Sequence, residues 1–410
     1  MFLYSNTILI LIFSSILIRA QQNNVCKEFI QYMTKTDGCY YNPDQNTELP
    51  DIVKRMGYPV ENYTVTTDDS YILTVFRIPR PGAKPVFVQH GISVSAICFT
   101  DTLNDSLAYV LYDAGYDVWL GNFRGNRYAN KHVFLNTDTL AYWNFSFHEM
   151  GKYDLKSQLG LVYEETNQKI YYIGYSMGTT ASYIYNILHP EESLQKLNIM
   201  VSLAPIAYLR NMSEIFESLA ELWMPLEPEI STITHGVVQQ RSEFSTFLTE
   251  TLCLSNTITM FICQVFTQSF VGMDLEQLRA ETLPIVSVQN PDAASTKTIT
   301  HYAQFVNSKR FQYFDYGRTA NTRIYGDPIA PLYDISNITI PIYLMHGEND
   351  QLATMSNVEN FFKDLPESTK KNGKFLVPYK KFNHLDFISA KDQKSLLYDP
   401  LVNFLKNPIL

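Results

Sequence analysis

The chain has 410 residues, 46% of them hydrophobic, which suffices for one large core with an insertion or for two modest domains. A formal net charge of −9 at pH 7 argues against a nucleic-acid partner and against a polybasic membrane patch. The acidic balance alone does not identify any other partner.

The N-terminal segment reads MFLYSNTILILIFSSILIRAQQ, and its apolar run from Ile8 to Ile18 is short for a membrane span. Ala20 supplies a small residue for cleavage, so we predict a secretory signal peptide over residues 1–20, although no Lys or Arg precedes the apolar run. An uncleaved signal anchor is the alternative. Since no later stretch resembles a transmembrane helix, we expect a mature chain without a membrane anchor, either extracellular or in a lysosome or digestive vacuole.

The five cysteines fit an oxidising compartment. Two pairs are close in sequence and are disulfide candidates. One candidate pair is Cys26 with Cys39, the other is Cys253 with Cys263, and Cys98 is left over. Sequence does not establish the pairing.

Triplets of the form N-x-S/T agree with the secretory route. Candidate glycosylation sites are Asn62, Asn104, Asn211 and Asn337. A fifth triplet begins at Asn144, but the aromatic run YWNFSF around it suggests burial, so we leave it out of the candidates.

Strand-like apolar runs alternate with helical patterns along most of the chain, which predicts an α/β fold with a mostly parallel sheet. The first runs, in residues 63–79, form a hairpin pattern with its turn at Asp68 to Ser70. Further strand patterns are KPVFVQHG, YDVWLGN, KIYYIGYS, LNIMVSLAP, IPIYLMHG and KFLVPYKKF. In such sheets functional groups gather at the carboxyl ends of the strands.

The alternation of strand and helix patterns stops between about Pro205 and Ala330, where helical patterns dominate. We therefore predict a core in two parts, residues 21–205 and 331–410, with a helical cap inserted at 206–330. A separate small domain without a role at the site is the alternative.

The segment KIYYIGYSMGTTASYIYNIL changes from a strand pattern to a helix pattern at Ser176. The flanking Gly174 and Gly178 allow a tight strand-to-helix turn that projects the serine hydroxyl from the top of the sheet. The N-terminus of the following helix favours negative charge at that place. We predict that Ser176 is a catalytic nucleophile.

A serine nucleophile needs a histidine base and an orienting acid, which follow it in the order Ser, Asp, His in this class of fold. In PYKKFNHLDF, His384 follows the last strand pattern and is the predicted base, whereas His346 precedes the acid and fails the order. In GENDQLA, Asp350 is the predicted acid and Glu348 is the alternative. Asp386 is expected to point away from the site and to shape the loop.

The negative oxygen of the reaction intermediate needs two hydrogen-bond donors. The amide of Met177, directly after the nucleophile, is one candidate, and the amide of Ile92 in VFVQHGISVSA is the other. We expect His90 to brace this turn. In GNFRGN we expect Arg124 to pair with Asp154 and to hold a loop, because a charge facing an apolar pocket would be costly.

Several blocks taken together resemble the acid lipases, which include gastric lipase, lysosomal acid lipase and steryl ester hydrolases. They occur in the family's order from about Glu28 to the C-terminus, and include VFVQHGISVSA, VWLGNFRGNRYANKH, YWNFSFHEMGKYDL, GYSMGTT, NPDAASTKTITHYAQF, GENDQLA and HLDF.

The resemblance implies an α/β-hydrolase fold with a cap over a hydrophobic pocket. It also implies hydrolysis of acylglycerols or cholesteryl esters without a cofactor or metal. The family's nucleophile, acid and base match Ser176, Asp350 and His384, and its cap disulfide resembles the pair of Cys253 with Cys263. The pair of Cys26 with Cys39 is not a feature of the resemblance. A further departure is Tyr175 before the nucleophile and Met177 after it, where many acid lipases have His and Gln.

The leading hypothesis is a lipid-ester hydrolase that works as a monomer at a lipid–water interface. A carboxylesterase for short soluble esters and a catalytically silent lipid-binding protein are the alternatives. The presence of Ser176, Asp350 and His384 argues against the silent protein.

Overall fold

The computed structural model describes residues 42–254 and 257–410. The predicted signal peptide lies outside these residues.

The structure tests one of the two predicted disulfides. Cys253 and Cys263 form a disulfide, with an S–S distance of 2.05 Å, so this pairing is confirmed. The other predicted pair is not among the described disulfides, because Cys26 and Cys39 both lie outside the described residues. A bond from Cys26 to Cys39 therefore stays a prediction. Cys98 is buried and has no disulfide partner among the described cysteines, as expected for the cysteine left over.

A single sheet dominates the described part of the chain, with the strand order β1-β2-β4-β3-β6-β7-β10-β11 and β5 paired to β2. The hairpin β1–β2 is antiparallel, as is the pairing of β2 with β4, whereas β4, β3, β6, β7, β10 and β11 run parallel. The strands are β1 (Glu61–Thr66), β2 (Tyr71–Ile78), β3 (Pro85–Gln89), β4 (Asp117–Gly121), β5 (Lys131–His132), β6 (Ile170–Tyr175), β7 (Leu197–Leu203), β10 (Ile342–His346) and β11 (Lys374–Leu376). The predicted α/β fold and its strands are confirmed.

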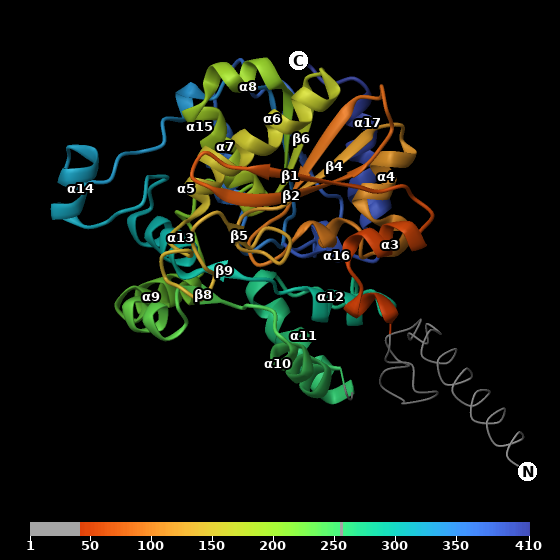
Figure 1. Ribbon diagram of the computed structural model, residues 1–410, viewed down its shortest axis with the longest axis horizontal. Coiled ribbons are helices and arrows are strands. Elements are labelled where there is room, and N and C mark those ends of the chain that lie inside the picture. Colours follow the sequence, from red (N-terminus) through yellow and green to blue (C-terminus); the bar gives the residue numbers. More distant parts are fainter. Residues whose placement is uncertain (1–41, 255–256) are drawn as a thin grey trace, which may run out of the picture.

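Burial along the strands follows from their place in the sheet. Every residue of β3, β4 and β6 is buried, because helices cover both faces of the central strands (Figure 1). The edge strand β1 instead alternates between exposed and half-buried residues.

The helices before and after the central insertion pack around this sheet (Figure 1). They are α3 (Leu49–Arg55), α4 (Leu107–Asp113), α5 (Phe147–Glu149), α6 (Leu155–Thr166), α7 (Met177–Leu188), α8 (Pro190–Lys196), α15 (Met355–Asp364), α16 (Asp386–Ser389) and α17 (Asp399–Lys406).

The segment between β7 and β10 carries several helices. Most of them, drawn in green and teal, lie below the sheet in Figure 1, and α14, in light blue, lies to its left. These helices are α9 (Glu214–Ile233), α10 (Glu243–Leu248), α11 (Thr257–Val271), α12 (Leu283–Gln289), α13 (Thr296–Ser308) and α14 (Arg318–Tyr325). A short antiparallel ladder of β8 (Val237–Val238) and β9 (Ala294–Ser295) joins its two halves, a feature that the helical patterns did not predict. The domain boundaries at 205/206 and 330/331 stay a prediction.

All four candidate asparagines are exposed. Asn144 is exposed as well, so the burial that we expected for it is wrong: its aromatic neighbours turn inward while its own side chain faces out.

Within the described residues no single helix is long and apolar enough to cross a membrane. Glu243–Cys253 and Ile258–Val271 meet the length and hydropathy of a span only when taken together, and this pair is bent by 111°.

Candidate active site

Ser176 lies in the sharp corner between β6 and α7, with φ 53° and ψ −116°, a conformation that is strained for any residue with a side chain. The two glycines of the motif let the chain pass through this corner. A Cβ atom on Gly178 would lie 2.5 Å from the carbonyl oxygen of Gln89, and one on Gly174 would lie 2.8 Å from the carbonyl carbon of Gly178. Larger residues at either position would therefore push the corner away from β3 or from α7.

The structure brings the three predicted side chains together at the carboxyl ends of the strands. The distance from Ser176 Oγ to His384 Nε2 is 2.8 Å, and His384 Nδ1 lies 2.8 and 3.0 Å from the two carboxylate oxygens of Asp350. In this geometry the hydroxyl donates to Nε2 and the Nδ1–H donates to the carboxylate. All three residues are buried.

Asp350 is held by the turn that follows β10. Its Oδ1 accepts hydrogen bonds from the amides of Leu352 and Ala353, at 2.8 and 2.7 Å. Glu348, the alternative acid, is exposed. The carboxylate in the site is therefore that of Asp350.

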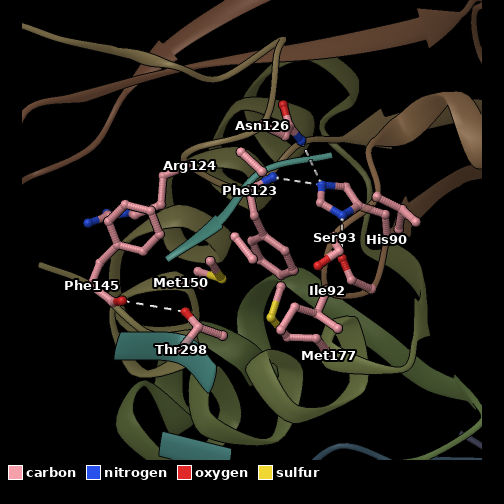
Figure 2. Close-up of a pocket in the computed structure, with 14 residues that line it drawn as sticks. His90, Ile92, Ser93, Phe123, Arg124, Asn126, Phe145, Met150, Met177 and Thr298 are labelled. Carbon is pink, nitrogen blue, oxygen red and sulfur yellow. Dashed lines mark hydrogen bonds between the residues drawn. The ribbon is translucent and has the colours of Figure 1, made fainter. Parts of the chain in front are cut away.

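Ile92 and Met177, whose amides are the predicted donors, line the same small cavity. Met177 is the first residue of α7, so its N–H has no partner within the helix. Among the described residues, neither the Ile92 nor the Met177 amide donates a hydrogen bond to another protein group. The two residues line one small cavity, shown in Figure 2, and an ideal Cβ on Gly91 would lie 3.0 Å from the Ser176 Cβ.

A second, larger cavity of about 330 Å³ opens from Ser176 toward the insertion. Its walls come from the loop after β7, from α9 and from α13, and they are almost entirely apolar. The lining residues are Ile92, Ser176, Ile206, Leu209, Met212, Phe216, Leu219, Ala220, Trp223, Ile299, Tyr302, Ala303, Val306 and Leu352. Such a cavity accommodates a hydrocarbon chain next to the hydroxyl.

Comparison with known proteins shows the family of the chain. Residues 84–391 match the family model described as "alpha/beta hydrolase fold", and residues 49–102 match a "Partial alpha/beta-hydrolase lipase region". The chain is 34% identical to human lipase member K over 374 residues (88% of this chain, 91% of the relative) and 33% identical to mouse gastric triacylglycerol lipase over 375 residues (89% and 93%). The chain belongs to the acid lipase family of α/β-hydrolases. The lipase is accordingly an enzyme that hydrolyses carboxylic esters of lipids.

The fold of the lipase is also similar to solved structures. A membrane phospholipase A, described as a bacterial virulence factor, superposes with a TM-score of 0.51 at 13% identity, covering 99% of both chains. At this identity the likeness concerns the fold alone.

Tyr175, one of the departures noted in the nucleophile motif, contacts the base of the lipase. Its phenol donates a 3.0 Å hydrogen bond to the main-chain carbonyl oxygen of His384, and the two rings lie 5.4 Å apart. The sequence showed the substitution but not this contact, because Tyr175 and His384 are 209 positions apart in the chain.

The end of α11 fastens to the loops that carry the acid and the base. The carbonyl oxygen of Val271 accepts the amides of Gln351 and His384, both at 3.3 Å, and the Asn383 side chain donates to the carbonyl oxygen of Gly272 at 2.8 Å. An ideal Cβ on Gly272 would lie 2.0 Å from the carbonyl oxygen of Asn349, so this approach requires glycine. Sequence reasoning missed this junction, since no local motif marks it.

Arg124 and Asp386, which we expected to hold loops of the lipase, both have polar partners. Arg124 donates from Nε to Asp154 at 2.8 Å, as predicted, and its two terminal nitrogens also reach Asp69 at 2.6 and 2.8 Å. Asp386 accepts the amide of Asn383 at 2.7 Å and thus shapes the loop before the base, as expected. Neither side chain reaches the serine.

Proposed function

We propose that this lipase is a serine hydrolase of neutral lipid esters, triacylglycerol first among them, and that it works through an acyl-enzyme. Ser176 serves as nucleophile, His384 as base and then acid, and Asp350 as the group that orients the imidazole. The observation that carries the proposal is the position of Ser176, hydrogen-bonded to His384 and lying at the wall of a large apolar cavity.

In the first half-reaction Ser176 Oγ attacks the ester carbonyl carbon while its proton passes to His384 Nε2. The imidazolium so formed faces the Asp350 carboxylate, which stabilises it. Collapse of the tetrahedral intermediate breaks the bond to the alcohol oxygen, which takes the proton from Nε2. Water then repeats the sequence on the acyl-enzyme and releases the fatty acid.

The amides of Ile92 and Met177 serve as the donors to the negative oxygen of the intermediate. Their freedom from other protein partners among the described residues supports this role. Their position does so too, because Met177 directly follows Ser176 and Ile92 lines a cavity together with Ser176. Loss of one such donor typically lowers kcat by about 10²–10³-fold.

A lipid surface as the partner is supported by apolar side chains that stay exposed. On α9 they recur at the spacing of one helix face, and others lie on α10 and α11 and in the loop after β5. These side chains are Ile215, Leu219, Leu222, Leu226, Ile233, Phe244, Phe247, Ile258, Phe261, Ile262, Phe266, Val133, Phe134 and Leu135. An apolar surface of this extent favours contact with lipid over water.

A compartment reached through the secretory pathway is part of the proposal. The disulfide of Cys253 with Cys263 in the insertion fits an oxidising environment. The exposed side chains of Asn62, Asn104, Asn211 and Asn337 are accessible to glycosylation.

A substrate series tests the proposal: emulsified triolein, emulsified cholesteryl oleate and soluble butyrate esters, each with the parent enzyme and with Ser176→Ala. We expect triolein hydrolysis that Ser176→Ala abolishes. Hydrolysis confined to the butyrate esters would favour a soluble-ester carboxylesterase, and no hydrolysis of any ester would favour a lipid-binding protein. Faster hydrolysis of cholesteryl oleate than of triolein would mean that cholesteryl ester, and not triacylglycerol, is the preferred substrate.

A further inference from the structure

His90, at the end of β3, makes three hydrogen bonds that tie it to two different loops (Figure 2). Its Nε2 accepts the amide of Phe123 at 3.0 Å and faces the Asn126 side-chain nitrogen at 2.9 Å. Its Nδ1 lies 2.8 Å from the carbonyl oxygen of Gly91. The imidazole is buried.

These partners fix the tautomer of the ring. A backbone amide can only donate, so Nε2 carries no proton and accepts from Phe123 and from Asn126. The neutral ring then carries its proton on Nδ1 and donates it to the Gly91 carbonyl oxygen. Burial favours the same form, because it lowers the pKa of His90 to about 4 against the weaker opposing effect of the Gly91 hydrogen bond.

The Gly91 carbonyl belongs to the same peptide unit as the amide of Ile92. This peptide is planar and trans, so its N–H points opposite to its C=O, and a hydrogen bond that fixes one fixes the other. We propose that His90 is the positioning residue of the oxyanion donor, its Nδ1–H holding the Gly91–Ile92 peptide so that the Ile92 amide faces the reacting oxygen. The inference rests on the proposed function and assigns His90 no contact with substrate.

The motif GNFRGN supplies the fixed support for this arrangement. The side chain of Asn122 donates to the carbonyl oxygen of Thr74 at 2.9 Å, and its oxygen accepts from Asn126 at 3.1 Å and from the amide of Ala96 at 3.0 Å. Asn126 is thereby oriented with its nitrogen toward the imidazole of His90. The loop after β4 thus holds the ring, and the ring holds the peptide beside Ser176.

The loop is held from its other end by the inserted segment. Ser93, with φ 57°, accepts the amide of Asp292 through its carbonyl oxygen at 2.7 Å. The Gly91–Ile92 peptide therefore lies between two residues, His90 and Ser93, that are held by hydrogen bonds. The hydrogen bond from His90 Nδ1 determines how this peptide is oriented.

Three variants separate positioning from packing. His90→Phe keeps a ring and removes every hydrogen bond; His90→Asn keeps a donor near Nδ1; His90→Gln keeps a polar group near Nε2 only. We expect kcat on a soluble butyrate ester to fall by about 10²–10³-fold in His90→Phe, the effect of one lost oxyanion donor, with KM changed by less than about threefold. The kcat of His90→Asn should be at least tenfold higher than that of His90→Phe, whereas the kcat of His90→Gln should not.

His301→Gln is the matched control, because this imidazole is also buried and hydrogen-bonded, to Ser146 and Gln312, but none of the three residues lines either cavity of the site. It should lower the melting temperature and leave kcat within about threefold of the parent. Equal kcat losses in the Asn, Gln and Phe variants, or a kcat for His90→Phe near that of the parent, would overturn the inference. If His90→Phe fails to fold, the comparison of Asn with Gln decides.

Nitrogen NMR of the parent enzyme labelled at histidine gives an independent readout. We expect the His90 ring to show a protonated Nδ1 and an unprotonated Nε2 at neutral pH; the opposite tautomer would contradict the inference. Failure of the proposed function is distinguishable, since it would show as ester hydrolysis that survives Ser176→Ala, whatever the result at His90.

Discussion

The phenol of Tyr175 donates a hydrogen bond of 3.0 Å to the carbonyl oxygen of His384, so the residue before the proposed nucleophile holds the main chain of the proposed base. Both residues are buried, and the hydroxyl of Ser176 lies 2.8 Å from the imidazole. A residue in the nucleophile motif thereby contacts the segment that carries the base.

Tyr175→Phe removes only this hydroxyl. We expect a stability loss of about 1 kcal/mol, typical of one buried hydrogen bond, and a kcat about three- to tenfold lower at unchanged KM. Tyr183→Phe is the control. The buried Tyr183 hydroxyl donates a 2.8 Å hydrogen bond to Ser202 and makes no hydrogen bond with the proposed triad. Equal kcat in the two variants would show that Tyr175 contributes stability alone.

Gly272→Ala tests the junction between α11 and the loops of the acid and the base. The added methyl group would lie 2.0 Å from the carbonyl oxygen of Asn349 and 2.9 Å from the Cβ of Asn383, at a φ of +113°. We expect kcat to fall at least tenfold because both loops must move. Gly373→Ala is the control: its φ is +72° with nothing within 4 Å of the added atom, so it should cost about 1 kcal/mol of stability and no activity. Comparable kcat values for the two would refute the junction's role.

The buried carboxyl group of Asp386 should make the stability of the fold depend on pH. Burial raises its pKa to about 8; the hydrogen bond from Asn383 opposes this rise, and the nearby carboxylate of Asp274 adds to it. The folded state thus keeps a proton that the unfolded chain releases near pH 4, so the resulting stability is complete below that pH and is lost as pH rises through 8. Stability should fall by up to about 1.4 kcal/mol per pH unit over this window.

Thermal melts from pH 5 to 9 check this, since Asp386→Asn is neutral throughout and should flatten the decline. Asp51→Asn, which removes an exposed carboxyl group on α3, is the control and should leave the decline as steep as in the parent. A decline equally steep in Asp386→Asn and the parent would contradict the prediction.

Phe134 tests the proposed lipid contact. Its side chain is 82% exposed in a loop whose amides at Phe134 and Leu135 donate to the His132 imidazole, at 2.9 and 3.0 Å. Phe134→Ser should weaken adsorption to triolein emulsion by about 30-fold, since burying such a side chain in lipid is worth about 2 kcal/mol. Hydrolysis of a soluble butyrate ester should not change. Undiminished adsorption would remove this loop from the lipid-contacting surface.

The sequence was informative where the chemistry is local or ordered along the chain. GYSMG marks a strand-to-helix corner, and the order of Ser176, Asp350 and His384 singled out the three side chains that meet in the structure. The ladder of β8 with β9 was not predictable, because two-residue strands carry no periodicity. Nor were the contacts of Tyr175 and Gly272, which depend on segments far apart in the chain.

Covalent labelling tests the central claim most directly. The enzyme is treated with a long-chain organophosphonate, and the modified peptide is identified by mass spectrometry. We predict a single adduct on the peptide containing Ser176, parallel loss of triolein hydrolysis, no adduct in Ser176→Ala and strongly slowed labelling in His384→Ala. An adduct on another serine that accounts for the lost activity, or full triolein hydrolysis by Ser176→Ala, would contradict the account.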